Sequence, residues 1–202
     1  MNADLNRDDA LHTEALNRFQ TLQTRVRQLG LREPDAVTLA TVDAQGTPHA
    51  RVVLLRLVDD RGFAFFTNSQ SHKGEQLAHH PHAAICAYWD GLGEQVRVTG
   101  RVEVVSDAES DAYWQSRARE SQLGAWASLQ SQPLASRDEL DLRLADFQQR
   151  FAGMEVPRPD HWHGYRVVPD RFEFWTNRPS RLHDRILYTR QASGWTRQLL
   201  YP

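Results

Sequence analysis

The sequence predicts a mainly β protein with helical additions, an α+β chain whose antiparallel strands form a small barrel. Short runs rich in β-branched and aromatic residues recur at hairpin spacing along the chain. Two Ser-x-x-Glu capping boxes, at Ser106 and Ser136, start helices among these strands. No internal repeat, low-complexity tract or long linker divides the 202 residues, so we expect a single domain.

The first 30 residues predict an N-terminal helical arm. Gly30 is the expected end of its helix. Residues 31–202 are then expected to form the barrel, with helical insertions at about 106–152. The apolar residues of the arm recur at steps of three and four, as on one face of an amphipathic helix: Leu11, Ala15, Phe19, Leu22, Val26 and Leu29.

The barrel is expected to begin with a meander of three strands over residues 37–42, 50–58 and 63–67, joined by short turns. A helix over 72–80 and a hairpin of strands over 83–89 and 95–105 follow. The capping boxes open helices after 106 and 136, with a helical stretch over 121–131 between them. Four further strands are expected at 165–168, 172–175, 186–190 and 195–199.

Composition limits the class of protein. A net charge of −2 gives no global basic surface, so we expect no nucleic-acid partner. No run approaches the roughly 20 apolar residues of a membrane span, and the N-terminus has no apolar signal core. Cys86 is the single cysteine, in agreement with a reducing compartment. We therefore expect a soluble cytoplasmic protein.

Residues 175–185 contain a dense cluster of positive groups: Arg178, Arg181, His183 and Arg185. Apolar strands flank the cluster, and Asn-Arg-Pro-Ser at its centre predicts the turn of a hairpin. Arginine forks suit phosphate or carboxylate, and a histidine can change protonation near neutral pH. Two interpretations remain open from this stretch alone. It is an anion site with a proton-handling residue, or a solvated hairpin tip paired with acids such as Asp184.

Three other stretches suggest anion binding. Arg51 and Arg56 are expected on opposite faces of one strand, because their separation is odd. Such a pair indicates an anionic ligand or a partner chain nearby, or else an edge strand with two solvated charges. Residues 66–73 run from a strand end into a helix start and include Lys73, the only lysine. Tyr113, Arg117 and Ser121 are spaced four apart. They share one face if the helix continues through them, and otherwise belong to a polar helix surface.

The remaining motifs give little evidence of function. His79, His80 and His82, with His161 and His163, match no zinc spacing, so we expect no metal. The sequence also contains no Walker loop, no Gly-x-Gly-x-x-Gly and no nucleophile elbow.

Taken together, these stretches resemble the pyridoxine/pyridoxamine 5′-phosphate oxidase family. The resemblance implies an FMN-binding split β-barrel that works as a homodimer with FMN at the interface. It also implies oxidation at C4′ of pyridoxamine and pyridoxine 5′-phosphates to pyridoxal 5′-phosphate, with hydride passing to flavin N5 and O2 reduced to H2O2. The matching segments follow the family order over residues of about 36 to 190: 51–56, 66–73, 95–100, 113–117, 121–126, 130–131, 174–175 and 181–185.

The resemblance also implies roles for individual residues. FMN would be lined by Arg51, Val52, Val53, Leu54, Leu55, Arg56, Phe66, Thr67, His72, Lys73, Gln95, Gln130, Ser131, Trp175 and Arg185. The substrate phosphate would be held by Arg56, Tyr113, Arg117 and Ser121. Arg181 and His183, with Leu182 between them, would lie over the substrate ring as the catalytic pair.

The chain departs from the family pattern in four places. Arg56 stands where the family commonly has lysine, and His72 where arginine is usual. The N-terminus lacks the family's basic, tyrosine-bearing arm, and the chain ends in Leu-Leu-Tyr-Pro rather than Arg-Leu-x-Pro. Two alternative functions stay open: an oxidase of the same fold acting on a reduced phenazine-type ring, and a non-catalytic carrier of FMN or pyridoxal phosphate.

Overall fold

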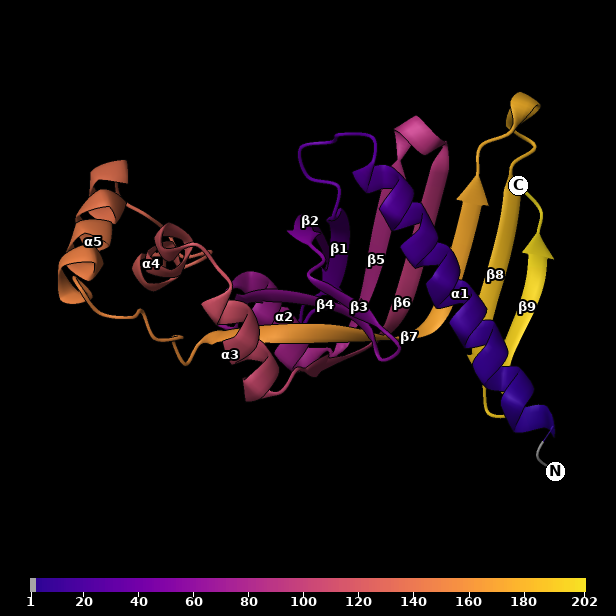
Figure 1. Ribbon diagram of the computed structural model, residues 1–202, viewed down its shortest axis with the longest axis horizontal. Coiled ribbons are helices and arrows are strands. Elements are labelled where there is room, and N and C mark those ends of the chain that lie inside the picture. Colours follow the sequence, from indigo (N-terminus) through magenta and orange to yellow (C-terminus); the bar gives the residue numbers. More distant parts are fainter. Residues whose placement is uncertain (1–2) are drawn as a thin grey trace.

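The computed structural model describes the backbone of residues 3–202 and the side chains of residues 10–202, so Met1 and Asn2 of the predicted arm lie outside the described residues. One curled antiparallel sheet of nine strands forms the body (Figure 1). The strands are β1 (Ala36–Val42), β2 (Pro48–Leu54), β3 (Leu57–Asp59), β4 (Gly62–Asn68), β5 (His82–Trp89), β6 (Glu94–Val104), β7 (Trp162–Thr176), β8 (Asp184–Gln191) and β9 (Gly194–Leu200).

Five helices and two 3-10 turns complete the described chain. The mainly β architecture with helical additions, predicted from the sequence, is confirmed. None of the helices in residues 3–202 combines the length and apolar character needed to cross a membrane. The helices are α1 (Ala3–Arg27), α2 (His72–His79), α3 (Asp107–Gln115), α4 (Arg119–Ala127) and α5 (Arg137–Arg150), and the 3-10 turns are η1 (Asp90–Leu92) and η2 (Pro179–Arg181).

Strand β7 organises the sheet because it has different neighbours along its length. Its first half pairs with β4, its second half pairs with β8, and β6 pairs with it almost throughout. The sequence predicted two strands here, at 165–168 and 172–175, on either side of Pro169. That prediction was wrong: a register shift beside Gly100 lets the strand continue past the proline. A side chain at Gly100 would place its Cβ 1.9 Å from the Val168 carbonyl oxygen.

The main core lies between α1 and the concave face of the sheet. Ala15, Phe19 and Val26 of α1 are fully buried there, and the Phe19 ring meets Phe63 edge-on at 4.8 Å. The expected amphipathic helix is thus confirmed, although it begins at residue 3 rather than 11. It ends at Arg27, and Gly30 in the following turn has a φ of +69°, the left-handed conformation that glycine adopts freely.

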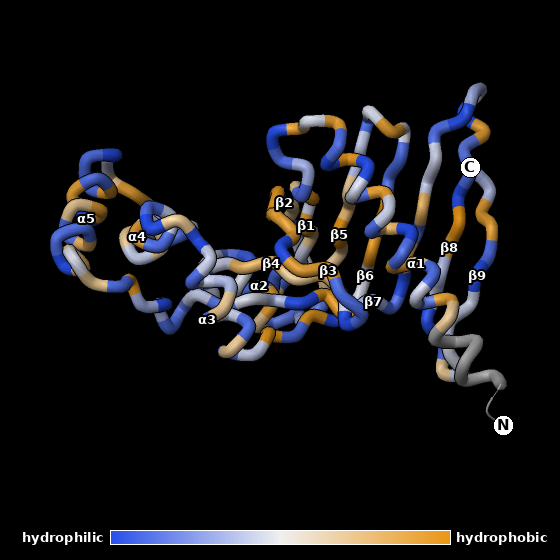
Figure 2. The backbone as a smooth tube through the Cα atoms, viewed as in Figure 1, coloured by the Kyte–Doolittle hydropathy of each residue, from blue (hydrophilic) through white to orange (hydrophobic). Residues whose placement is uncertain are grey.

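A second, smaller core supports the helices that project from the sheet. Trp114 of α3, Leu123 of α4 and Trp162 at the start of β7 are buried together. Helices α3, α4 and α5 extend to one side of the sheet in Figure 1. Helix α5 has no buried residue, and Figure 2 shows hydrophobic stretches on α4 and α5 far from the main core.

Two local predictions need correction. The expected strand over 50–58 breaks between β2 and β3. The backbone N–H of Leu55 donates a hydrogen bond to the Asp35 carbonyl, and that of Arg56 donates to the Ala64 carbonyl. The expected continuous helix through Tyr113 and Ser121 is interrupted, because α3 ends at Gln115 and α4 begins at Arg119. The hydrophobic run and the spacing of four gave no local signal for either break.

Candidate functional site

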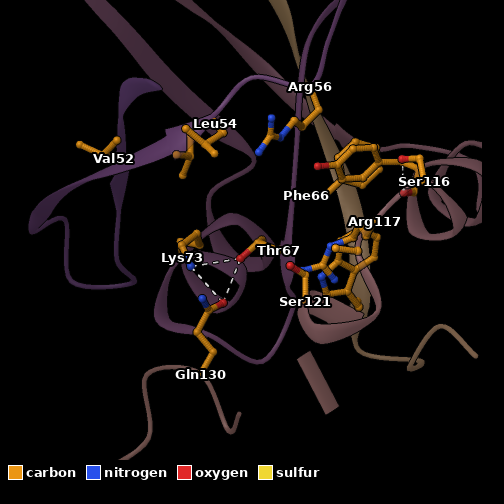
Figure 3. A pocket seen from close by; sticks show the side chains of 14 residues that line it. Val52, Leu54, Arg56, Phe66, Thr67, Lys73, Ser116, Arg117, Ser121 and Gln130 are labelled. Carbon is orange, nitrogen blue, oxygen red and sulfur yellow. Dashed lines mark hydrogen bonds between the residues drawn. The ribbon is translucent and has the colours of Figure 1, made fainter. Parts of the chain in front are cut away.

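A cavity of about 560 Å³ lies where the barrel meets α3 and α4. This volume is in the range of small-molecule sites. Three of its lining residues are cationic, namely Arg56, Lys73 and Arg117, and none is a carboxylate. Figure 3 shows Lys73 and Arg117 on different sides of the cavity. The lining comprises Val52, Val53, Leu54, Arg56, Phe66, Thr67, Lys73, Tyr113, Ser116, Arg117, Ala118, Ser121, Gln130 and Trp162.

Lys73 is held on one side of the cavity by neutral oxygen atoms. Its Nζ donates to Thr67 Oγ1 at 3.1 Å and Gln130 Oε1 at 3.3 Å (Figure 3). It also donates to Ser71 Oγ at 3.2 Å. Ser71 is also the N-cap of α2, and its side chain accepts from the Gly74 amide. Burial, with the nearby charge of Arg51, lowers the pKa of Lys73 to about 8. A cation desolvated without an acidic partner favours an anionic ligand.

Arg117 forms the opposite cationic group. Its guanidinium lies over the rings of Trp114 and Trp162, 5.1 and 4.9 Å from their centroids. Burial lowers the pKa of Arg117, and the positive charge of Arg56 adds to that effect. The Arg117 Nη1 atom is buried and has no hydrogen-bond partner among the described residues. Such a donor is costly unless a ligand accepts from it.

An aromatic stack forms the wall beside Arg117. Phe66 stacks on Tyr113 at 4.2 Å and on Trp162 at 5.3 Å between ring centroids. Gly164 lies opposite Phe66 in the β4–β7 pair, and a Cβ there would come within 2.6 Å of the phenyl ring. Glycine at this position therefore leaves room for the stack, which fixes the position of Tyr113.

Two arginines hold helix α3 against the barrel. Arg166 of β7 is 2% exposed and donates to Glu109 at 2.9 Å. This bond, supported by Ser106 and Arg61, lowers the pKa of Glu109 to about 2. Arg158 donates to Asp107 and Asp111 of the same helix. Helix α3, which carries Tyr113, is thus fixed by charged groups at its N-terminal half.

The predicted hairpin at 175–185 is present, and its turn lies at the opposite end of β7. The ring of His183 packs against Trp175, with 4.4 Å between centroids. Arg185 donates from Nε and Nη2 to the buried Glu173 and from Nη1 to the Tyr201 carbonyl. A second cavity, of about 360 Å³, includes His183 and Arg185 in its lining. Arg178 pairs with Asp184 at 2.6 Å. For this arginine, the structure therefore agrees with the alternative interpretation of a hairpin tip whose charges pair with acids.

The predicted site residues therefore fall into two groups. The cavity brings together the predicted phosphate set, Arg56, Tyr113, Arg117 and Ser121, although a helix break separates α3 from α4. Seven further residues predicted to contact FMN line the same cavity: Val52, Val53, Leu54, Phe66, Thr67, Lys73 and Gln130. The remaining predicted residues do not line this cavity: Arg51, Leu55, His72, Gln95, Ser131, Trp175, Arg181, Leu182, His183 and Arg185.

Some of these residues have clear structural partners instead. Arg51 donates to Thr41 Oγ1 at 2.5 Å and to Gln76 Oε1 at 3.0 Å. Leu55 is 1% exposed and belongs to the main core. His72 is exposed at the start of α2.

Sequence reasoning missed three lining residues, namely Ser116, Ala118 and Trp162. Ser116 and Ala118 line the cavity because the chain breaks between α3 and α4, which no local pattern indicated. Trp162 follows a proline-rich link and joins Phe66 only through the strand pairing of β4 with β7. Trp162 could therefore have been assigned to the cavity only if the pairing of β4 with β7 had been known.

Comparison with known proteins gives consistent matches. The family model described as pyridoxamine 5′-phosphate oxidase matches residues 22–151, and the model of the pyridoxine 5′-phosphate oxidase C-terminal dimerisation region matches residues 162–202. A pyridoxine/pyridoxamine 5′-phosphate oxidase of Myxococcus xanthus (strain DK1622) is 58% identical over 94% of this chain and 92% of its own length. A pyridoxine/pyridoxamine 5′-phosphate oxidase from Thermosynechococcus vestitus is 52% identical over 99% of this chain and 98% of its own length.

Solved structures show the same fold. PhzG from Burkholderia lata 383, in complex with tetrahydrophenazine-1-carboxylic acid, superposes with a TM-score of 0.87 at 32% identity, covering 92% of this chain and 91% of that one. An FMN-binding protein from Nostoc punctiforme PCC 73102, related to pyridoxamine 5′-phosphate oxidase, superposes with a TM-score of 0.75 at 20% identity. The match covers 92% of this chain and 96% of that one. The antiparallel split barrel expected from the sequence is thereby confirmed.

Proposed function

The chain belongs to the pyridoxamine 5′-phosphate oxidase family, and from this membership we propose that it is an FMN-dependent oxidase producing pyridoxal 5′-phosphate. Its substrates would be pyridoxamine and pyridoxine 5′-phosphates, with O2 as the electron acceptor. FMN, when bound, would take the hydride from substrate C4′ and pass the electrons to O2, giving H2O2. The protein groups would bind, orient and shield the reactants.

The observation that carries this proposal is the charge of the main cavity. Three cations line it without a carboxylate, and the buried Nη1 of Arg117 has no partner among the described residues. FMN and both substrates carry a phosphate, which accepts several charge-assisted hydrogen bonds. The donor set therefore fits phosphorylated ligands.

The two cationic sides suggest which phosphate binds where. Lys73, with Thr67 and Gln130, supplies a cation and polar groups at the helix α2 side, which suits the FMN phosphate. Arg56, Arg117, Tyr113 and Ser121 line the other side, which suits the substrate phosphate. Arg56, in place of the family's usual lysine, can still donate to phosphate there, now as a planar fork.

We further propose a homodimer in which each site uses both chains. The His183 turn and the main cavity lie at opposite ends of β7, whose 15 residues span about 50 Å of extended chain (Figure 1). One chain therefore does not bring Arg181 and His183 to its own Arg117. The turn belongs to the segment that matches the family's dimerisation region. A second copy supplying this turn would complete the cavity and enclose FMN at the interface.

A visible spectrum of the FMN-loaded protein, followed by anaerobic addition of pyridoxamine 5′-phosphate, tests the function. We expect the yellow protein to bleach and to recover its colour when air is admitted. The Arg117→Ala variant should stay yellow and bleach only at much higher substrate concentration, because one to two charge-assisted bonds worth about 1.5–3 kcal/mol each are lost.

Two results would contradict the proposal. A yellow protein that bleaches with a dihydrophenazine carboxylate and not with the phosphorylated vitamer would favour the phenazine-type oxidase, a reading that the similarity to PhzG keeps relevant. A yellow protein that bleaches with neither compound would favour a carrier.

A further inference from the structure

The β7–β8 turn holds the ring of His183 from two directions. The backbone N–H of Arg178 donates to His183 Nδ1 at 3.2 Å. The Trp175 ring packs against the imidazole, with 4.4 Å between centroids and 43° between planes. Both contacts come from the β7 side of the turn, whereas His183 lies directly before β8. The ring is therefore fixed in position and in rotation.

The turn that carries these contacts is strained and tightly closed. Ser180 and Arg181 have φ values of +59° and +61°, in the left-handed region that non-glycine residues rarely occupy. The Leu182 amide donates to the Pro179 carbonyl at 3.2 Å, which closes the 3-10 turn. Such strain persists only where surrounding contacts determine the conformation, and it concentrates at functional sites.

An ion pair closes the base of the same turn. Arg178 Nε lies 2.6 Å from Asp184 Oδ2, so the residue whose amide contacts His183 is itself anchored to the neighbouring strand. Thr176 and Asp184 are also paired across the β7–β8 ladder. These contacts keep the Arg178 N–H directed at the imidazole.

The direction of this hydrogen bond determines the tautomer of His183. A backbone N–H can only donate, so Nδ1 must offer its lone pair, and the proton of the neutral ring is then on Nε2. Turning the ring over would bring a carbon atom opposite the Arg178 amide and leave that N–H unpaired. In residues 10–202 no side chain or backbone group hydrogen-bonds Nε2 of His183.

We infer that His183 acts on the substrate as a hydrogen-bond donor through Nε2–H, and that the Arg178 backbone amide is the positioning group that fixes this tautomer. The inference rests on the proposed function and goes beyond it by assigning the proton. The nitrogen left for the substrate carries a proton and no lone pair, so it cannot remove the proton of the substrate amine or alcohol. It matches an electron-rich acceptor atom of the substrate ring.

Nitrogen NMR of histidine-labelled, FMN-loaded protein tests the tautomer directly. The signals of His183 are identified by their absence in the His183→Asn variant. We expect Nε2 to show an attached proton and Nδ1 to resonate as an unprotonated nitrogen. A proton on Nδ1 with an unprotonated Nε2 would overturn the inference, whether or not the protein oxidises the vitamer.

Two variants test the donor role in turnover. His183→Gln retains an amide N–H near the Nε2 position. The shorter His183→Asn can keep an amide oxygen near the Nδ1 position, as an acceptor for the Arg178 amide, but places no N–H at the Nε2 position. We expect Gln to keep most of kcat/KM and Asn to lose about 10- to 100-fold more, the range for one hydrogen bond to a charged or polar ligand. Equal loss in both variants, or a smaller loss in Asn, would refute the donor role.

The exposed His82→Gln variant serves as a control for the substitution itself and should behave as wild type. Wild-type turnover separates the two levels of the argument. A wild type that does not oxidise pyridoxamine 5′-phosphate contradicts the proposed function, while the tautomer measurement still decides the assignment of the proton.

Discussion

Lys73 is a half-buried cation that has no acidic partner among its hydrogen bonds. Its three acceptors are two hydroxyl groups and one amide oxygen. Burial lowers its pKa from 10.5 to about 8. Because the folded state binds the proton less well than the unfolded state, stability of the ligand-free protein rises with pH between about 8 and 10.5. Below pH 8 the full cost of the desolvated charge is present.

The same pKa predicts the pH dependence of FMN binding. The FMN phosphate is dianionic above pH 7 and prefers the protonated lysine. We expect the Kd of FMN to increase as the pH rises through about 8, where free Lys73 loses its proton. Quenching of flavin fluorescence across pH 7–9.5 measures this.

Lys73→Met is the matched variant for this prediction. It should bind FMN more weakly, with no increase in Kd above pH 8, and its ligand-free form should melt at a higher temperature than wild type at pH 7. An unchanged pH dependence in Lys73→Met would show that another group controls binding.

Helix α3, which carries Tyr113 of the candidate site, is fixed to the barrel by an ion pair. Arg166 is 2% exposed, and its partner Glu109 occupies the capping box that starts the helix. The lowered pKa of Glu109, about 2, means that its ionised form stabilises the fold above pH 4.5 and that this contribution is lost as the pH falls toward 2. The Glu109 carboxylate is 24% exposed, so solvent screening reduces the contribution to about 1 kcal/mol.

The Glu109→Gln variant tests this role. We expect it to lower the free energy of unfolding at pH 7 by about 1–3 kcal/mol, because Arg166 loses its nearest charged partner. The difference from wild type should shrink between pH 4.5 and 2. Asp141→Asn, which removes the exposed partner of Arg137 on α5, should change stability by less than about 0.5 kcal/mol. Urea unfolding at pH 7 and pH 3 compares them, and equal effects of the two substitutions would contradict a special role for Glu109.

Elements with a local signal were predictable, and elements defined by pairing were not. Helix α1, the Ser106 capping box and the β7–β8 turn follow from periodicity, capping and turn residues. The break at Leu55 depends on hydrogen bonds to distant residues, and the continuity of β7 past Pro169 depends on a register shift in its pairing with β6. Local sequence contains neither partner.

The candidate site also has features that the local sequence predicts and features that it does not. Its cationic residues stand out in the sequence because charge and spacing are local properties. Their separation into two groups at opposite ends of β7 is a property of the whole sheet, as is the contact of Trp162 with Phe66. Only the three-dimensional arrangement shows that Arg117 and His183 of one chain cannot meet.

At the scale of the whole molecule, this separation leads to a test of shared sites. Arg117→Ala removes a cavity residue and Arg181→Ala removes a turn residue, so each homodimer should retain FMN and oxidise pyridoxamine 5′-phosphate poorly. In a heterodimer of the two variants, one site combines both defects. The other combines an intact cavity from one chain with an intact turn from its partner.

Co-expression with two different affinity tags isolates this heterodimer. We expect it to recover about half of the wild-type turnover per dimer, because one of its two sites is intact. The two purified homodimers, mixed without exchange of subunits, provide the control and should stay inactive. If each site were built within one chain, every site of the heterodimer would contain a defect and no activity would return. The recovered activity therefore distinguishes a site shared between chains from one that only lies near the dimer interface.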